Sequence, residues 1–304
     1  MPQAILKVET LTKHFGGIHA VDDVTFDVQR GSITSLIGPN GAGKTTVFNV
    51  ATGLYEKTSG VIRFEPDGDG SVDLTERVFD PLHATLVSGA SAGLGLIALM
   101  IPSARRKLYY RARTPDSLTR LGIARTFQNI RLFSDLSVLD NVKVGLHGRV
   151  RSNAVDAALT SPRHRREERE IEDAAMRYLE FVGLEDRATE AASDLPYGDQ
   201  RQLEIARALA TRPSLLLLDE PGAGMNPTET NELIELIERT RDTGVTVFLI
   251  EHDMRLVMDV SDRIIVLDHG RKIAEGSPAE VRDNPEVIAA YLGIADEDTA
   301  DAPA

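Results

Sequence analysis

Apolar and polar residues alternate at the start of the chain, and this alternation predicts antiparallel strands in residues 5 to 30 with a turn at Gly16-Gly17. A short apolar run at residues 32 to 37 is typical of a buried strand, and residues 45 to 50 are suited to open a helix. Residues 61 to 64 predict one more strand after a turn. A strand, a loop and a helix therefore follow one another directly after the first hairpin.

Helices and strands alternate through the second half of the chain. The predicted elements are a helical stretch at 135–192, a helix at 200–210 after a turn that contains Pro196 and Gly198, a strand at 215–220, a helix at 228–240, a strand at 245–250, a hairpin at 264–274 and a last helix at 278–292. Such alternation indicates an α/β fold whose sheet carries its ligand at the carboxyl ends of the strands. Polar residues that directly follow a strand are therefore the candidates for chemistry.

The composition narrows the class of protein. The chain has 304 residues, enough for a large core, and its 47 acidic residues outnumber its 34 lysines and arginines, for a formal net charge of −13. This balance argues against a nucleic-acid partner, because general nucleic-acid binders need a basic surface to displace counterions. The absence of cysteine excludes a disulfide framework and any thiolate metal site.

Eight consecutive residues match the phosphate-loop pattern G-x-x-x-x-G-K-[ST]. They are Gly38, Pro39, Asn40, Gly41, Ala42, Gly43, Lys44 and Thr45. A predicted strand precedes them and a predicted helix, which Thr46 continues, follows them, which is the context that a true phosphate loop requires. Glycines let backbone N–H groups turn toward phosphates, Lys44 would neutralise the β and γ phosphates, and the Thr45 hydroxyl would hold Mg²⁺. The loop predicts binding of a nucleoside triphosphate.

Two acids end the apolar strand that begins at Leu215, namely Asp219 and Glu220. In phosphoryl transfer, an acid at the end of such a strand helps to hold Mg²⁺, and a second group orients the attacking water. We therefore assign the metal role to Asp219 and the base role to Glu220, whereas without the phosphate loop the pair would be read as a helix N-cap. Phe15, just before the first glycine turn, suits either the core or a stacking contact with a purine.

The segment at about 66–116 differs from the rest and reads as an insert. Within it, residues 84–101 carry no charge, and a basic cluster with Tyr109 and Tyr110 follows. Eighteen residues reach the lower limit for a membrane span, and the basic flank suits contact with headgroups or with a membrane subunit. The alternative is a buried or partner-covered helix in a soluble insert.

The motifs and their order resemble those of the ATP-binding cassette (ABC) ATPase subunits of membrane transporters. The matching positions are the phosphate loop at 38–45, a lid-type glutamine at Gln128, a signature segment at Leu195-Pro196-Tyr197-Gly198-Asp199-Gln200-Arg201, the acidic strand at 215–220 and a switch histidine at His252. The resemblance implies a P-loop NTPase with a RecA-like core, an antiparallel β subdomain and a helical subdomain at about 129–200. One domain would span residues 5–293 around the insert, and 294–304 would be a disordered acidic tail.

The resemblance also implies roles for individual residues in ATP hydrolysis. Phe15 would stack on adenine, Glu220 would orient water, and His252 would contact the γ-phosphate. Gln128 would sense Mg²⁺ and the attacking water. Two ATPase subunits would meet head to tail, so that each ATP lies between the phosphate loop of one and the Gly198 region of the other. Permease subunits would anchor the pair at the cytoplasmic face of the cell membrane and link it indirectly to an extracytoplasmic solute-binding protein.

The signature segment departs from the family's common L-S-G-G-Q. Pro196 replaces the serine, Tyr197 replaces one glycine, and Asp199 replaces the glutamine. Gly198 and the helix start that follows remain, so backbone N–H groups and the helix dipole could still serve a phosphate. The charge of Asp199 is unfavourable in that position. Asn226 stands where the family often has an aspartate near the dimer seam.

Several stretches resemble the first of two ATPase types in the branched-chain amino acid importers. They are Arg125-Thr126-Phe127-Gln128, Gly198 to Ala208, Gly224-Met225-Asn226-Pro227, Ile250 to Met254, and Asn284 to Gly293. Permeases and binding proteins choose the solute, so the amino acid assignment rests on this analogy. The alternatives are a urea or amide importer, an exporter ATPase of the lipopolysaccharide type, and a non-transport cassette protein acting in DNA repair or translation. A single cassette and the acidic balance stand against the last.

The other six histidines show no pairing at the spacing of metal ligands. They are His14, His19, His83, His147, His164 and His269. We expect them at the surface and outside any metal site.

Overall fold

The computed structural model describes residues 3–66, 70–76, 78–79, 110–111, 115–147 and 162–292. The apolar segment at 84–101, most of the predicted insert and the tail at 294–304 lie outside the described residues. Within the described ranges, no helix is both long and apolar enough to span a bilayer.

An antiparallel sheet of four strands forms from the N-terminal hairpin and the strands that follow the first helix. In the order β2-β1-β4-β5, its strands are β2 (Ile18–Gln29), β1 (Ala4–Phe15), β4 (Ser59–Phe64) and β5 (Val72–Asp73). The hairpin with its turn at Gly16-Gly17 is confirmed. β5 pairs with β4, and Leu74 is buried, so this part of the predicted insert contributes to the sheet.

A second sheet of six strands carries the nucleotide motifs. In the order β12-β11-β3-β10-β9-β8, its strands are β12 (Arg271–Gly276), β11 (Arg263–Asp268), β3 (Ile33–Ile37), β10 (Thr246–Ile250), β9 (Leu215–Asp219) and β8 (Ile123–Arg125). Only β12 runs antiparallel to its neighbour; the others pair in parallel. The buried strands β3, β9 and β10 read as apolar runs because both faces of the sheet are covered.

The described helices are α1 (Lys44–Ala51), α5 (Pro115–Leu121), α6 (Val138–Leu146), α8 (Pro162–Val182), α9 (Tyr197–Ala210), α10 (Pro227–Asp242), α11 (Met254–Val260), α12 (Pro278–Arg282) and α13 (Pro285–Leu292). The prediction of one helix at 278–292 was wrong, because the chain breaks at Asp283 and restarts where the Asn284 side chain accepts from the Glu286 amide. The stretch at 135–192 is not continuous either; α6 and α8 are followed by short 3₁₀ turns at Glu185–Arg187 and Ala192–Asp194. A separate pair, β6 (Val78–Phe79) and β7 (Tyr110–Arg111), completes the described elements.

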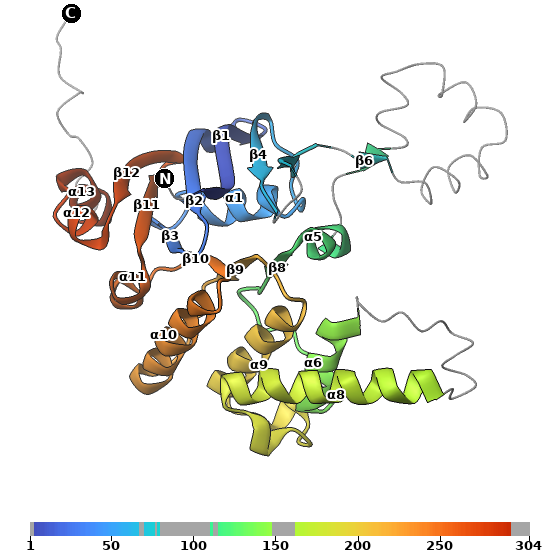
Figure 1. Ribbon diagram of the computed structural model, residues 1–304. Coiled ribbons are helices and arrows are strands. Elements are labelled where there is room, and N and C mark those ends of the chain that lie inside the picture. Colours follow the sequence, from blue (N-terminus) through green and yellow to red (C-terminus); the bar gives the residue numbers. More distant parts are fainter. Residues whose placement is uncertain are drawn as a thin grey trace, which may run out of the picture.

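The layers are held together by buried clusters on opposite faces of the six-stranded sheet. α1 lies between the two sheets, where Phe48 shares a cluster with apolar residues of β1 and β2 and with Leu217 and Phe248. Leu216 and Leu218 point to the other face and join the cluster of α6, α8, α9 and α10. Figure 1 shows α6, α8 and α9 as a helical group on the side away from the antiparallel sheet. α9 ends at Ala210, beyond the bound of about 200 predicted for the helical subdomain.

Candidate functional site

Strand register brings the predicted motifs to one edge of the six-stranded sheet. Ile250 at the end of β10 is in register with Leu36 of β3 on one side and with Asp219 of β9 on the other. The loops that follow these three strands therefore leave the sheet side by side, as the carboxyl ends of parallel strands must. The phosphate loop follows β3, the two acids end β9, and His252 follows β10.

The phosphate loop has a backbone that only glycine permits at two points. Gly38 has φ 148°, and a Cβ placed on it would lie 2.1 Å from the Leu267 carbonyl oxygen. Gly43, the N-cap of α1, has φ 100°, and its Cβ would lie 2.3 Å from the Ala20 carbonyl oxygen. The loop can therefore turn its N–H groups toward an anion at the start of α1, where the helix dipole favours negative charge.

The Lys44 side chain folds back onto its own loop. Its Nζ donates to the carbonyl oxygens of Gly38, at 2.7 Å, and Pro39, at 3.0 Å, and the residue is buried. Burial lowers the pKa of Lys44, and the nearby Glu220 carboxylate opposes this change. The Thr45 side chain is exposed at the first turn of α1. An ammonium and a hydroxyl are thus available to phosphates and to a cation at the same helix start.

One carboxylate oxygen gathers two of the predicted catalytic side chains. Gln128 Nε2 donates to Glu220 Oε2 at 2.9 Å, and His252 Nδ1 lies 3.7 Å from the same oxygen. Glu220 itself is held in a left-handed backbone conformation with φ 48°, and its amide donates to the Ile250 carbonyl. The structure therefore brings Gln128, Glu220 and His252 together from three separate loops.

Asp219 is paired with a residue to which the sequence assigned no role. Arg125, the last residue of β8, donates to Asp219 Oδ2 at 2.7 Å and to the Thr52 hydroxyl at 2.7 Å. The guanidinium also lies over the rings of Phe48 and Phe127. Both charged side chains are almost fully buried. The sequence signal for Arg125 was only its place in the R-T-F-Q stretch.

A buried ion pair of α9 holds the backbone that carries Gln128. Arg201 is fully buried and donates to the carbonyl oxygens of Phe127, at 2.8 Å, and Gln128, at 2.9 Å. Its partner is Glu204, at 2.6 Å, whose other oxygen accepts from the Phe127 and Arg131 amides. The helix after the signature segment is thereby bonded to the lid glutamine loop. No sequence signal pointed to the ion pair of Arg201 and Glu204, which we call the α9 clamp.

The signature segment differs from its prediction in two ways. α9 begins at Tyr197, so Gly198 belongs to the first helical turn rather than to the preceding loop, and a Cβ on it would lie 3.0 Å from Glu229 Cγ. Asp199 is not an isolated charge, because Arg187 pairs with it. The unfavourable charge expected next to a phosphate is therefore partly neutralised within the chain.

Glu251 orders the turn after β10. It is fully buried, and its carboxylate accepts from the amides of Gly222, at 2.7 Å, His252, at 2.9 Å, and Asp253, at 3.3 Å. The turn that presents His252 is thus tied to the loop after Glu220. The sequence signal for Glu251 was its position directly after an apolar strand. The role at this position was assigned to His252 instead.

Phe15 is not a core residue. It is 41% exposed, meets Tyr55 edge to face and lies under Lys13 Nζ. The core alternative is therefore wrong, and an aromatic face remains available for stacking.

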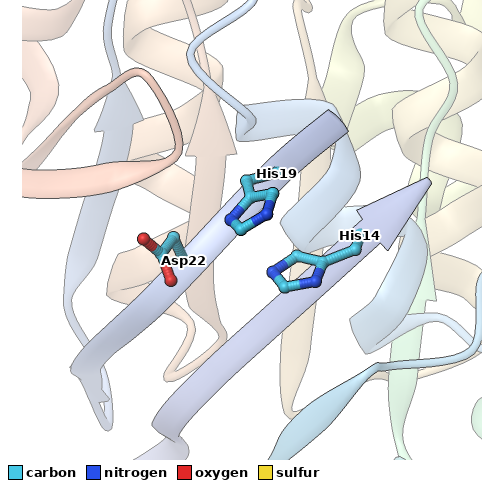
Figure 2. Close-up of side chains that lie close together, drawn as sticks. All are labelled: His14, His19 and Asp22. Carbon is cyan, nitrogen blue, oxygen red and sulfur yellow. The ribbon is translucent and has the colours of Figure 1, made fainter. Parts of the chain in front are cut away.

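Among the described histidines, His19, His147 and His269 are exposed, as expected, whereas His14 is partly buried. His14 of β1 and His19 of β2 are register partners whose rings stack, with centroids 3.8 Å apart (Figure 2). They are five positions apart in sequence, a spacing typical of no helical ligand pair, and the hairpin with its turn at Gly16-Gly17 brings them together.

Two known protein families match this chain in sequence. Residues 21–79 and 88–223 match the family described as ABC transporter, and residues 271–297 match the one described as branched-chain amino acid ATP-binding cassette transporter. The high-affinity branched-chain amino acid transport ATP-binding protein LivG of Salmonella typhimurium is 42% identical over 97% of this chain and 100% of its own length. BraF of Pseudomonas aeruginosa, which bears the same description, has the same identity and coverage.

Solved structures agree with the sequence relatives. The ADP conformation of MJ1267, an ATP-binding cassette of an ABC transporter, matches with a TM-score of 0.71 and 27% identity over 96% of this chain and 99% of that one. A nucleotide-free ATP-binding cassette matches with a TM-score of 0.70 and 28% identity over 95% of this chain and 99% of that one. The chain belongs to the ATP-binding cassette transporter family and is a nucleotide-binding ATPase of that family.

Proposed function

We propose that this chain hydrolyses ATP to power an importer of branched-chain amino acids, working at the cytoplasmic face of the cell membrane. The observation that carries the hydrolytic part is the meeting of Gln128 and His252 at one oxygen of Glu220, beside the phosphate loop. The substrate is supported by the relatives, whose names include branched-chain amino acid transport and which match nearly the full chain.

In the proposed reaction, the chain positions ATP and a water molecule. Phe15 stacks on adenine, and the N–H groups of the phosphate loop through Thr46 bind the phosphates at the start of α1. Lys44 leaves its carbonyl partners and neutralises the β and γ phosphates. Glu220 orients the attacking water, and His252, exposed beside it, contacts the γ-phosphate.

Mg²⁺ is part of this proposal because the donors nearby are oxygen atoms, which Mg²⁺ prefers. Thr45 supplies an exposed hydroxyl, Gln128 an amide oxygen and Asp219 a carboxylate. Arg125 bonds to one oxygen of Asp219, so the other oxygen is the one that suits a cation or its water. When bound, the ion neutralises charge that develops on the phosphates.

We propose that a second ATPase subunit, identical or related, completes the site. Gly198 lies in the first turn of α9, with Tyr197 42% exposed beside it. Backbone N–H groups at this turn can meet the γ-phosphate of ATP held by the other subunit. Pairing of Asp199 with Arg187 makes this approach less unfavourable for a triphosphate.

A groove between α5, α6 and α9 suits the permease subunits. Its volume is about 710 Å³, and its lining includes Arg120, Arg131, Phe133, Val144 and Arg207. Phe133 is 51% exposed, and Val144 is exposed nearby. The groove borders the backbone held by the α9 clamp, so a permease segment seated in it would move with Gln128.

Replacing Glu220 tests the hydrolytic assignment. Glu220→Gln should abolish ATP hydrolysis while the protein still binds ATP and forms an ATP-dependent dimer, measured by phosphate release, nucleotide binding and light scattering. Glu232→Gln, on the exposed face of α10, is the control and should hydrolyse ATP normally. Unchanged turnover in Glu220→Gln would remove Glu220 from this role.

The substrate is tested by reconstitution of the chain with its permeases in vesicles. ATP hydrolysis should rise when binding protein loaded with leucine, isoleucine or valine is added. A rise with urea or an amide instead would assign the chain to a related importer. Hydrolysis that ignores every loaded binding protein would contradict an import function.

A further inference from the structure

Two histidines and an aspartate gather where the N-terminal hairpin turns. His14 and His19 face each other across β1 and β2, and Asp22 lies three residues further along β2 (Figure 2). One potential ligand atom of each residue lies within 4.8 Å of those of the other two. Among the described residues, this is the one cluster of three such groups. It lies outside the phosphate and acid motifs described above.

One nitrogen of the His14 ring lacks a hydrogen-bond partner. This nitrogen is Nε2, and it is buried. A buried polar atom without a partner costs free energy, so such an atom in a native fold calls for an explanation. Neutral imidazole presents an unprotonated nitrogen, which is the form that binds metal ions.

Asp22 retains an oxygen for a ligand. Arg271 donates to it from Nε at 2.9 Å and from Nη2 at 2.7 Å, and both contacts fall on Oδ2. The hydrogen bonds from Arg271 lower the pKa of Asp22. The same arginine competes with any cation for Asp22. It therefore weakens the cluster as a metal site without removing a ligand.

We propose that His14, His19 and Asp22 bind one divalent transition-metal ion of the zinc class. Imidazole with carboxylate suits Zn²⁺, Ni²⁺ or Cu²⁺ rather than Mg²⁺, which prefers oxygen ligands alone. Ligands of a tetrahedral ion lie about 3.4 Å apart, so the rings must turn from their stacked position. That rotation is about the soft χ2 torsion of histidine. Three protein ligands leave a fourth position to water.

The position of the cluster links it to the nucleotide site. Phe15 directly follows His14, and the Ala20 carbonyl after His19 packs against the phosphate-loop residue Gly43. An ion that joins β1 to β2 here would stiffen the end of the hairpin that carries Phe15. Metal occupancy should therefore alter the affinity for nucleotide, although metal binding itself requires none.

The direct test is titration of untagged, chelator-stripped protein with Zn²⁺ and with Co²⁺, in the absence of nucleotide. Calorimetry should show one ion per chain, and Co²⁺ should give the visible absorption of nitrogen and oxygen coordination. His14→Ala and His19→Ala should each weaken binding more than about tenfold. His147→Ala is the matched control, because this exposed histidine of the segment after α6 lies outside the cluster, and it should bind normally.

Arg271→Gln separates this site from adventitious binding. Removing the competing cation should tighten Zn²⁺ binding several-fold, whereas an unrelated histidine site would ignore the change. Circular dichroism of each variant checks that the fold is kept, and His19→Asn is a milder substitute if His19→Ala unfolds. Binding that is unaffected by both histidine changes, or absent below about 1 mM Zn²⁺, would overturn the proposal. Because no nucleotide is present, neither outcome bears on ATP hydrolysis.

Discussion

The guanidinium of Arg125 donates to the carboxylate of Asp219 at 2.7 Å, between the ends of two neighbouring parallel strands. Arg125 is the last residue of β8 and precedes Gln128 by three positions, while Asp219 precedes Glu220. The pair therefore joins the loop that carries the lid glutamine to the strand that carries the acids. Its burial makes the two charges depend on each other.

Loss of Arg125 should destabilise the fold. Arg125→Met leaves Asp219 as an unpaired buried charge, so we expect the free energy of unfolding to fall by about 3–5 kcal/mol. Urea denaturation measures the change. The control is Arg120→Met, which removes an exposed pair with Asp116 and should cost less than about 1 kcal/mol. Equal effects of the two substitutions would show that the buried pair carries no special weight.

Variants of the α9 clamp should affect the stability of the fold and the turnover of ATP differently. Arg201→Met alone leaves the buried Glu204 carboxylate without its cationic partner, so we expect the free energy of unfolding to fall by about 3–5 kcal/mol. The double variant Arg201→Met with Glu204→Met removes both charges and should regain most of that stability.

Turnover should not return with stability. In the double variant the Phe127 and Gln128 carbonyls lose their donor, so kcat should stay reduced while ATP affinity is unchanged. Steady-state kinetics and nucleotide binding, both measured well below the unfolding midpoint temperature of the variant, give these two quantities. Full recovery of kcat in the stable double variant would show that the clamp serves only the fold.

ATP affinity should fall at alkaline pH because of Lys44. Burial lowers the pKa of this lysine below its ordinary value of 10.5. Phosphates favour the ammonium, so nucleotide raises that pKa again and its binding takes up a proton. Affinity should therefore decrease as pH rises through the pKa of the free protein, by at most about tenfold per pH unit. Fluorescent-nucleotide titrations from pH 7 to 10 test this, and Lys44→Met should bind weakly without that slope.

Glu251 should act through the turn that carries His252. Glu251→Ala leaves three amides without their acceptor, at a cost of about 1–3 kcal/mol for each one that water does not reach. We expect reduced stability and a lower kcat, because His252 loses its fixed position beside Glu220. Glu235→Ala, on the exposed side of α10, is the matched control and should change neither quantity. A Glu251→Ala enzyme with normal kcat would show that this turn keeps its shape unaided.

Local pattern was enough for the elements that carry the motifs. The alternation in residues 5 to 30, the glycines of the phosphate loop and the apolar run that ends at Asp219 each report on neighbours in sequence, so the hairpin, the loop and β9 could be predicted. Helix boundaries were harder. Pro285 and the cap at Asn284 divide the last helix. Gly198 falls inside α9, where the absence of a Cβ allows a close approach to Glu229 of α10.

Tertiary structure decided every contact between residues distant in sequence. Arg125 and Asp219 are 94 residues apart, and Arg201 and Gln128 are 73 apart, so no local signal could pair them. His14 and His19, in contrast, are only five positions apart, and they are neighbours because of the register of a hairpin that the sequence predicted. Sequence by itself determined that the chain binds and hydrolyses a nucleoside triphosphate. Only the folded chain, by burying charges that must then find partners, decided how its loops are coupled.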